Sequence, residues 1–340
     1  KRVREDDLPI HTVEAGRTPL LVWGFTGQGS QRRAMAASLY RDDRVFRDAL
    51  DGALHQVATL SIPLKADDLR TVLLTDDPRI HDTRFTQPAL VAYGWALSQR
   101  WMALGVRPEA VCGHSVGEIT AALVAGMLSL TDAMWLASER GRLMAELPQD
   151  GAMAAALTDE EQVAALVEEH SGVSIAAVNG PAETVFAGDR EGVDAIVHDL
   201  EAAGVTVRRL KVSHAFHSPL MQPVLEPLAA VASQLGVFPA RIPFVSAVHG
   251  KTVSALDADY WVRHARGTVR FADALAALVR PGDVFLEIGP RPILCGMSAA
   301  QVDAHFVPSA DRGADDLEVL LRAVGELWTR GLHVDVGSLY

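Results

Sequence analysis

The sequence has few cysteines and no long apolar run, and these absences exclude several classes of protein. Cys112 and Cys295 are the only cysteines among 340 residues and form no CxxC pair. A disulfide framework and a cysteine-based zinc site are therefore not expected, and both thiols should be buried. No run of about 18 apolar residues is present, so no membrane-spanning helix is predicted. The first residues, KRVREDDLPIHTVEAGR, lack the apolar core of a signal peptide, which favours a cytoplasmic protein.

Positive charge is also scarce. The chain has 31 Lys and Arg against 43 Asp and Glu, a net charge of -12. Because nucleic-acid binding needs a basic surface that neutralises phosphates, nucleic acid is not an expected partner. The hydrophobic content of 49% is enough for a sizeable core, and the length predicts one large domain or two. A small anionic substrate would need a locally placed arginine.

Apolar runs alternate with helix-forming stretches in both halves of the chain. PLLVWGF at 19–25 precedes the glycine turn TGQGSQ and the helical stretch RRAMAASLY. The same order recurs in EAVCGHSVGEITAALVAGML at 109–128, and the runs at 242–248 and 283–289 are typical of further buried strands. This alternation predicts a parallel α/β sheet covered by helices.

The segment 151–212 has a different order of elements, β-α-β-β-α-β. Its first helix should begin at a capping box formed by Thr158 and Glu161, and its second should span about 190–203. The expected strands are 151–156, 173–178, 184–188 and 205–212. This order is typical of a ferredoxin-like module.

These patterns divide the chain into four parts. Residues 1–18 are expected to form an N-terminal linker, and 19–150 together with 213–305 a large α/β subdomain. The ferredoxin-like small subdomain, 151–212, is inserted into it, and 306–340 form a C-terminal helix and linker.

The pentapeptide Gly113-His114-Ser115-Val116-Gly117 matches G-x-S-x-G between a predicted strand and a predicted helix. Flanking glycines permit a sharp turn that exposes the serine hydroxyl, and helix N–H groups can stabilise an oxyanion. The structural alternative is a serine that caps the helix. The pattern alone does not decide between the two readings.

The histidines of VSHAFHSPLM are the best candidates for a base. His217 precedes Ser218-Pro219, the signature of a helix start, so it lies on a loop where a site can form. Pro223 should bend the helix that follows. A metal site made by His214 and His217 is disfavoured, because no third ligand has zinc spacing and no H-E-x-x-H occurs.

Eight stretches together resemble a known family. They are TGQGSQ (26–31), DTRFTQPAL (82–90), GHSVGE (113–118), ERGRLM (139–144), AVNGP (177–181), HAFHSPLM (214–221), TVRF (268–271) and EIGPRPIL (287–294). In this order they resemble the acyltransferase domain of modular polyketide synthases and, more distantly, malonyl-CoA:acyl-carrier-protein transacylases. The resemblance implies a large subdomain akin to α/β hydrolases with a ferredoxin-like insert, in agreement with the patterns above.

The resemblance also implies roles for individual residues. Ser115 would be the nucleophile and His217 its base, with an oxyanion hole made by the backbone N–H groups of Gln28 and Val116. Arg140 would bind the free carboxylate of a dicarboxylic acyl group, as the planar fork of a guanidinium allows. Without the resemblance, Arg140 reads as a surface arginine of a helix.

Further residues have supporting roles in this interpretation. The backbone carbonyl of Arg270 would orient the catalytic histidine, although Asp283 or Glu287 remain alternatives as an acidic third member. Phe216 and His214 would set specificity, and Gln87 and Asn179 would support the site. No metal and no bound cofactor are expected.

The matching stretches also contain departures from the family pattern. Arg291 stands where the family commonly has histidine, and Trp23 lies beside the end of a strand. Little of the linker that precedes the domain in full synthases is present, which favours a domain cut from a longer chain.

The expected function is transfer of a malonyl unit from malonyl-CoA, through a seryl ester, to the phosphopantetheine arm of an acyl carrier protein. Malonyl is favoured over methylmalonyl because HAFH stands at 214–217, where methylmalonyl-type domains have a sequence similar to YASH. Phe216 would fill the space that a methyl group at C2 requires. Expected partners are the carrier protein and neighbouring ketosynthase and other synthase domains. The alternatives are a serine hydrolase or thioesterase on the same fold, a domain selecting another acyl-CoA, and a catalytically inactive docking module.

Overall fold

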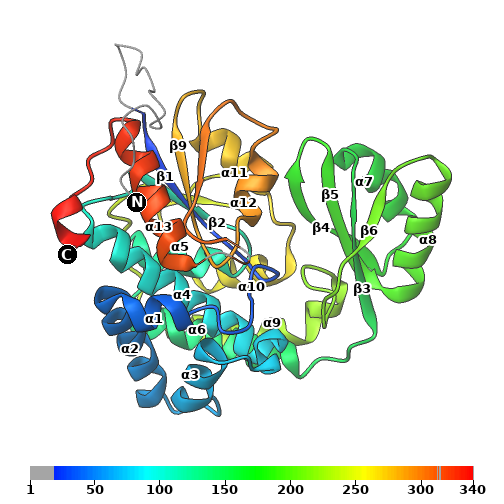
Figure 1. The fold of residues 1–340 in the computed structure, drawn as a ribbon. Coiled ribbons are helices and arrows are strands. Elements are labelled where there is room, and N and C mark those ends of the chain that lie inside the picture. The colour runs from blue at the N-terminus through cyan, green and yellow to red at the C-terminus, as the bar shows by residue number, and fades with distance from the viewer. Residues whose placement is uncertain (1–18, 312, 314, 340) are drawn as a thin grey trace.

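The computed structural model describes residues 19–339 except 312 and 314, and Figure 1 shows a large subdomain beside a small one. The expected linker 1–18 lies outside the described residues. The strands of the large subdomain are β1 (Leu21–Phe25), β2 (Ala110–Gly113), β7 (Phe244–Ser246), β8 (Lys251–Thr252), β9 (Val284–Ile288) and β10 (His305–Pro308). Its helices are α1 (Ala37–Asp42), α2 (Arg44–Thr59), α3 (Ala66–Leu74), α4 (Thr83–Ala103), α5 (Gly117–Val124), α6 (Leu130–Ala145), α9 (Gln222–Ala232), α10 (Ala258–Arg266), α11 (Phe271–Leu278), α12 (Ile293–Ser298) and α13 (Asp316–Thr329). The described residues also include the short 3-10 helices η2 (Pro78–His81), η3 (Pro219–Met221) and η4 (Val336–Leu339).

The larger sheet has the strand order β10-β9-β1-β2-β7-β8. All neighbouring strands are parallel except β8, which pairs antiparallel with β7 at one edge. All five residues of β1, in the middle, are buried, as expected for a strand covered on both faces. The parallel α/β sheet predicted from the sequence is therefore confirmed.

Helix α4 is the central helix of the part below the sheet in Figure 1, where it packs against α2 and α6. Most of its 21 residues are buried, which explains why its sequence has apolar residues on every face rather than on one stripe. The first polar side chains of α4 point toward the turn that follows β1, where Thr83 contacts Gln28. The helix thus connects the core to the candidate site.

The small subdomain consists of β3 (Gly151–Ala156), α7 (Glu160–Glu168), β4 (Val173–Gly180), β5 (Glu183–Asp189), α8 (Arg190–Ala202) and β6 (Val207–Arg209). Its antiparallel sheet has the order β4-β5-β3-β6, and the predicted ferredoxin-like order of elements is confirmed. One face packs around Phe186 against α7 and α8. Residues on the other face, such as Met153 and Ala187, belong to the core of the large subdomain. The insert is therefore packed onto the large subdomain by its sheet.

Several predicted element boundaries are wrong in detail. Asp159, and not Thr158, caps α7, because its carboxylate accepts the Gln162 N–H at 2.9 Å. The closing strand covers only Val207–Arg209 of the expected 205–212. The first helix begins at Ala37, since the residues before it form turns.

Pro223 does not bend a helix. The chain forms the 3-10 turn η3 and then starts α9 anew at Gln222, so Pro223 occupies the first turn, where its missing N–H costs no hydrogen bond.

The expected boundary at 305/306 falls within β10, which pairs with β9 from His305 to Pro308. Helix α13 then packs against β10 and α1. The C-terminal helix therefore belongs to the large subdomain, and its exposed face includes Leu321 and Trp328.

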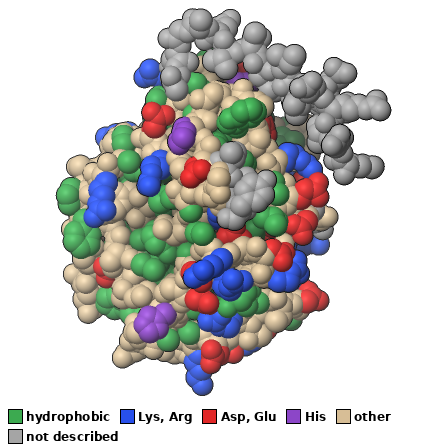
Figure 2. All heavy atoms as spheres, turned by 60° about the vertical axis from the view of Figure 1, so that its left-hand side comes forward, with side chains coloured by type: hydrophobic (Ala, Val, Ile, Leu, Met, Phe, Trp, Pro, Cys, Tyr) green, Lys and Arg blue, Asp and Glu red, His purple; other side chains and the backbone are tan. Residues whose placement is uncertain are grey.

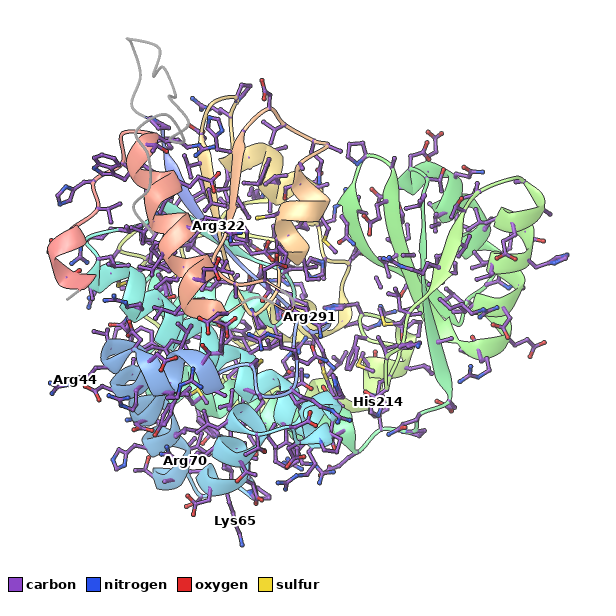
Figure 3. All side chains as sticks on the ribbon, viewed as in Figure 1. Arg44, Lys65, Arg70, His214, Arg291 and Arg322 are labelled. Atoms are coloured by element: carbon purple, nitrogen blue, oxygen red, sulfur yellow. The ribbon has the colours of Figure 1, made fainter. Side chains whose placement is uncertain are left out.

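The two cysteines are free and buried, as predicted. Within the described residues no helix is long and apolar enough to cross a membrane. On the face shown in Figure 2, basic and acidic side chains are interspersed with apolar ones. In Figure 3, Arg44 and Lys65 point outward at the periphery, whereas Arg291 lies on the side of the large subdomain that faces the small one. Arg70 instead binds Asp51 on α2 at 2.7 Å.

Candidate active site

The predicted nucleophile lies on a sharp turn between β2 and α5. Ser115 has φ of +49°, a left-handed backbone that costs a non-glycine residue about 1–3 kcal/mol. A Cβ at Gly113 would lie 2.3 Å from the Glu118 nitrogen, and one at Gly117 would lie 2.2 Å from the Phe25 carbonyl oxygen. Glycine is therefore required at both flanking positions, as the G-x-S-x-G pattern predicts.

Ser115 and His217 are 102 residues apart in sequence and meet in the structure. The Ser115 hydroxyl lies 2.7 Å from Nε2 of His217, whose Nδ1–H donates to the carbonyl oxygen of Gly267 at 2.9 Å. That bond fixes the tautomer in which Nε2 is free to accept the serine proton. Burial, followed by the charges of Arg140 and His114, lowers the pKa of His217 to about 3, so the imidazole is neutral near pH 7.

The carbonyl that holds the imidazole is not the one expected. Gly267 accepts from His217, whereas the backbone of Arg270 donates to Ala247 and its guanidinium pairs with Glu160 at 2.5 Å. Arg270 also binds Asp273 at 2.6 Å, so its side chain joins α7 to α11. The expectation for Arg270 was wrong because a loop carbonyl three residues earlier is the one that faces the histidine.

The two acidic alternatives for a third member bind backbone groups. Asp283 accepts the N–H groups of Leu20 and Arg280 at 3.0 and 2.9 Å. Glu287 accepts the N–H groups that start α12, those of Ile293, Leu294 and Cys295. A backbone carbonyl, and not a carboxylate, therefore orients His217.

The predicted oxyanion donors, Gln28 and Val116, belong to two turns that lie against each other. A Cβ at Gly27 would be 2.4 Å from the His114 carbonyl, so the loop that carries Gln28 lies directly against the nucleophile turn. Val116 is the N-cap of α5. In the part of the chain that the structure describes, neither the Gln28 nor the Val116 N–H donates to a backbone acceptor. Both groups are available to an oxyanion.

Arg140 on α6 is a buried cation, not the surface arginine of the alternative reading. Its side chain is 2% exposed, and Nη1 donates to Oε1 of Gln87 at 2.6 Å. Gln87 is itself fixed by Thr83 at 3.0 Å. The Nε and Nη2 groups of Arg140 have no acceptor among the described residues. Burial lowers the pKa of Arg140 to about 10, while the charge of Glu118 acts in the opposite direction.

His214 makes its hydrogen bonds to residues other than Ser115 and His217. Its Nε2–H donates to the carbonyl of Leu147 at 3.0 Å, and its Nδ1 accepts from Ser213 at 2.9 Å. Figure 3 places it on the segment that leads back from the small subdomain. The ring of Phe216 lies 5.9 Å from that of His214 and is 8% exposed. Among the described residues, no group of three or more His, Cys, Asp or Glu side chains is placed to hold a metal.

The small subdomain contacts His217 and the residue that precedes Ser115 through β4. The Ser174 hydroxyl donates to the carbonyl of His217 at 3.0 Å. His114, next to the nucleophile, donates from Nε2 to the Asn179 side-chain oxygen at 2.9 Å. Asn179 was expected from the sequence to support the site, whereas Ser174 was not. The only sequence signal of Ser174 is a hydroxyl residue in the apolar first part of the strand, VSIAAV.

Three further residues near the pair carry no prediction from the sequence. Glu118 and His264 are buried, and the Nε2–H of His264 donates to the Ser115 carbonyl at 2.8 Å. Gly267 contributes only a backbone carbonyl, which no residue pattern reveals. Glu118 had a usable signal, because a carboxylate directly after the turn glycine stands within an apolar helix.

Trp23, one of the two departures from the family pattern, is fully buried in β1 and packs against Phe25.

Comparison with known proteins agrees with this geometry. The family model described as "Acyl transferase domain" matches residues 22–334. The chain is 44% identical over 326 residues to Polyketide synthase GfsA of Streptomyces halstedii, covering 92% of this chain but only 4% of that protein. It is 41% identical over 344 residues to a phenolphthiocerol synthesis polyketide synthase of Mycobacterium marinum, covering 97% of this chain and 16% of that protein. The chain thus spans a small part of the curated relatives it matches.

A solved structure has the same fold over nearly the whole chain. It is the acyltransferase domain from the second module of the salinomycin polyketide synthase, with a TM-score of 0.89 and 40% identity. The match covers 95% of this chain and 76% of that one. The family model and this solved structure each match most of the sequence, and the turn that carries Ser115, its bond to His217 and the inserted antiparallel module agree with that match. This chain therefore belongs to the acyl transferase domain family.

Proposed function

We propose that this domain loads a malonyl unit from malonyl-CoA onto the phosphopantetheine arm of an acyl carrier protein in a cytoplasmic polyketide synthase. The observation that carries the proposal is the buried Arg140, whose Nε and Nη2 groups lack an acceptor in the described structure. Its charge helps to lower the pKa of His217, so the guanidinium lies within electrostatic reach of the base. A dicarboxylic acyl group would place its thioester at Ser115 and its free carboxylate at Arg140.

In the first half-reaction the Ser115 oxygen forms a bond to the thioester carbonyl carbon while its proton passes to Nε2 of His217. The Gln28 and Val116 N–H groups stabilise the resulting oxyanion, each contributing about 2.7–4 kcal/mol by analogy with other oxyanion holes. The carbon–sulfur bond then breaks, and the imidazolium returns the proton to the CoA thiolate. The product is a malonyl ester of the serine.

The second half-reaction reverses these roles. The phosphopantetheine thiol gives its proton to His217, and its sulfur attacks the ester carbonyl. The ester carbon–oxygen bond breaks, and the proton moves from the imidazole to the Ser115 oxygen. The Gly267 carbonyl stabilises the imidazolium in both steps through Nδ1. Neighbouring ketosynthase and other synthase domains would then use the loaded carrier protein.

The preference for malonyl over methylmalonyl rests on Phe216. Its bulky ring directly precedes the catalytic His217 and is almost fully buried. A missing methyl group changes binding by only about 1–3 kcal/mol, so exclusion of the larger substrate by a bulky side chain is the stronger device.

Competition between malonyl-CoA and methylmalonyl-CoA, measured as relative adduct masses, tests this preference. Phe216→Ser should raise the share of methylmalonyl adduct. Preferential methylmalonyl loading by the unmodified domain would refute the preference, and an unchanged ratio in the variant would show that Phe216 does not cause it.

Incubation with malonyl-CoA followed by intact-mass measurement tests the function as a whole. A stable adduct that is lost in Ser115→Ala supports acyl transfer. Rapid CoA release without an adduct would indicate a thioesterase, and neither product would indicate an inactive docking module. His217→Ala should reduce loading by orders of magnitude, whereas the matched variant His214→Ala should reduce it much less.

A further inference from the structure

Helix α10 presents one face to the catalytic pair. Tyr260, His264 and the helix-ending residue Gly267 are spaced by four and three residues, so they lie on the same side of the helix. The Gly267 carbonyl holds Nδ1 of His217, and the His264 side chain holds the backbone of Ser115. One short helix therefore contacts both the base and the nucleophile.

The bond from His264 acts on the strained residue of the nucleophile turn. The Ser115 carbonyl accepts from Nε2 of His264 at 2.8 Å and from the Glu118 N–H at 2.9 Å. A carbonyl can only accept, so the proton of His264 resides on Nε2. Burial and the charge of Arg140 hold the pKa of His264 well below its usual range, which keeps this donor in a neutral ring. A left-handed serine persists only when its surroundings fix it, and this bond is one such restraint.

Glu118, in the first turn of α5, forms a buried polar cluster with Tyr260, His264 and Ser246. Its carboxylate accepts from the Ala247 N–H and from the Tyr260 hydroxyl, the latter at 2.6 Å. It also lies 3.6 Å from Nε2 of His264. The Tyr260 oxygen is in turn 2.8 Å from the Ser246 hydroxyl at the end of β7. The nucleophile turn, α10 and β7 are therefore joined by polar side chains that are all buried.

Burying such a polar cluster contributes less to the free energy of unfolding than apolar packing of the same volume can. Burial raises the pKa of Glu118 to about 8, against the opposing effects of its hydrogen bonds from Tyr260 and Ala247 and of the charge on Arg140. Well-packed apolar side chains often stabilise a core as well as or better than buried charged groups. The position of this cluster behind the nucleophile suggests that it sets geometry as well as stability.

We propose that His264 is a positioning residue for the serine nucleophile, and that Glu118 and Tyr260 hold its imidazole against the Ser115 carbonyl. Without the bond from Nε2, the turn relaxes and the serine hydroxyl moves away from Nε2 of His217. A displacement of about 1 Å can slow a reaction by about a hundredfold. The proposal rests on the role of Ser115 as the nucleophile, but not on the identity of the acyl group.

The test compares His264→Leu, which removes the donor, with His264→Gln, whose amide keeps an N–H. A fluorophosphonate probe that reacts with activated serines measures the nucleophile without any acyl-CoA, and malonyl loading gives kcat and KM. We expect His264→Leu to slow labelling and kcat by about 10- to 100-fold with KM for malonyl-CoA unchanged, because the bond acts on orientation. His264→Gln should recover most of the labelling rate.

Two buried tyrosines provide a matched control. Tyr260→Phe removes the hydroxyl that binds Glu118 and should slow labelling several-fold. Tyr93→Phe removes a buried hydroxyl that has no hydrogen-bond partner within the described residues, and it should leave labelling unchanged. If His264→Leu does not fold, this pair decides the question, and equal labelling by both would overturn the proposal.

Further outcomes of these assays test the positioning role of His264 and the proposed substrate separately. Wild-type labelling rates in His264→Leu would overturn the proposal, as would equal losses in the Leu and Gln variants together with a lower melting temperature. Labelling of wild-type Ser115 without any malonyl adduct would refute the proposed substrate while leaving the positioning role intact. Absence of labelling in the wild type would refute both.

Discussion

Replacing Arg140 with methionine separates what this buried guanidinium does for the fold from what it does for the substrate. The pKa of Arg140 is lowered from 12.5 to about 10, chiefly by burial, which corresponds to a cost of about 3 kcal/mol for keeping the charge inside the protein. Methionine removes this cost. It also leaves Oε1 of Gln87 without its donor, which costs about 1–3 kcal/mol. We therefore expect Arg140→Met to change the free energy of unfolding by no more than about 2 kcal/mol.

The double variant Arg140→Met with Gln87→Leu removes both partners of the hydrogen bond. Replacement of both partners by apolar groups can be neutral or stabilising, so the double variant should be at least as stable as the single one. Thermal unfolding of the three proteins measures this difference. Met144, whose sulfur contacts the Gln87 amide at 3.3 Å, provides apolar surroundings for the leucine.

The effect on loading should be large and selective. A substrate carboxylate that accepts from Nε and Nη2 would gain about 1.5–3 kcal/mol from each charge-assisted bond. Loss of about 3 kcal/mol or more lowers kcat/KM for malonyl-CoA by at least about a hundredfold. Acetyl-CoA has no free carboxylate, so its slower loading should change by less than about threefold. Single-turnover mass measurements with both substrates give the ratio, and equal losses for both would refute the carboxylate role of Arg140.

Two predictions concern the titration of His217, and two concern variants elsewhere in the fold. Because the pKa of His217 is lowered from 6.5 to about 3, acylation should show no loss from protonation of the base between pH 8 and about 5. Below pH 6.5 the unfolded chain binds a proton at His217 that the native protein does not bind. As the pH falls from 6.5 toward 3, the free energy of unfolding should therefore decrease by up to about 1.4 kcal/mol per pH unit from this group. His217→Asn should reduce this slope in denaturation experiments at different pH. Ser174→Ala, which removes the bond to the His217 carbonyl, should destabilise the fold by about 0.5–1.5 kcal/mol and slow loading several-fold without changing KM, and an unchanged rate would contradict a role of β4 in the site. Gly52→Ala in α2 meets no atom within 4 Å and should raise the free energy of unfolding by about 0.5–1 kcal/mol in chemical denaturation with loading unchanged, whereas a loss of stability would show that α2 packs differently.

The parts of the fold and site that depend on local sequence were predictable. Gly113 and Gly117 mark a turn that only glycine can flank, and the apolar runs on either side fix the strand and the helix. The order of elements in 151–212 likewise determined a ferredoxin-like sheet. The pairing of Ser115 with His217 came from the family resemblance, because no local pattern connects residues 102 positions apart.

The errors concern contacts that more than one residue can make. Thr158 and Asp159 are both good helix caps, and only the path of the chain from β3 selects the second. A carbonyl is common to every residue, so the sequence cannot show that Gly267 rather than Arg270 faces the imidazole. The short strand β10 contains a proline and gives only a weak strand signal, although it forms the edge of the larger sheet.

The contacts of β4 with His217 and His114 have a consequence for domain engineering. A chimera made by exchanging residues 151–212 with those of another synthase would cut the chain at plausible loop boundaries. It would also replace Ser174 and Asn179, which bind the His217 carbonyl and the His114 imidazole. Grafts that preserve a hydroxyl and an amide at these two places should keep turnover, while grafts chosen by strand boundaries alone should yield folded but slow enzymes. We therefore expect the contacts of Ser174 and Asn179 with His217 and His114 to limit which inserts can be exchanged without loss of activity.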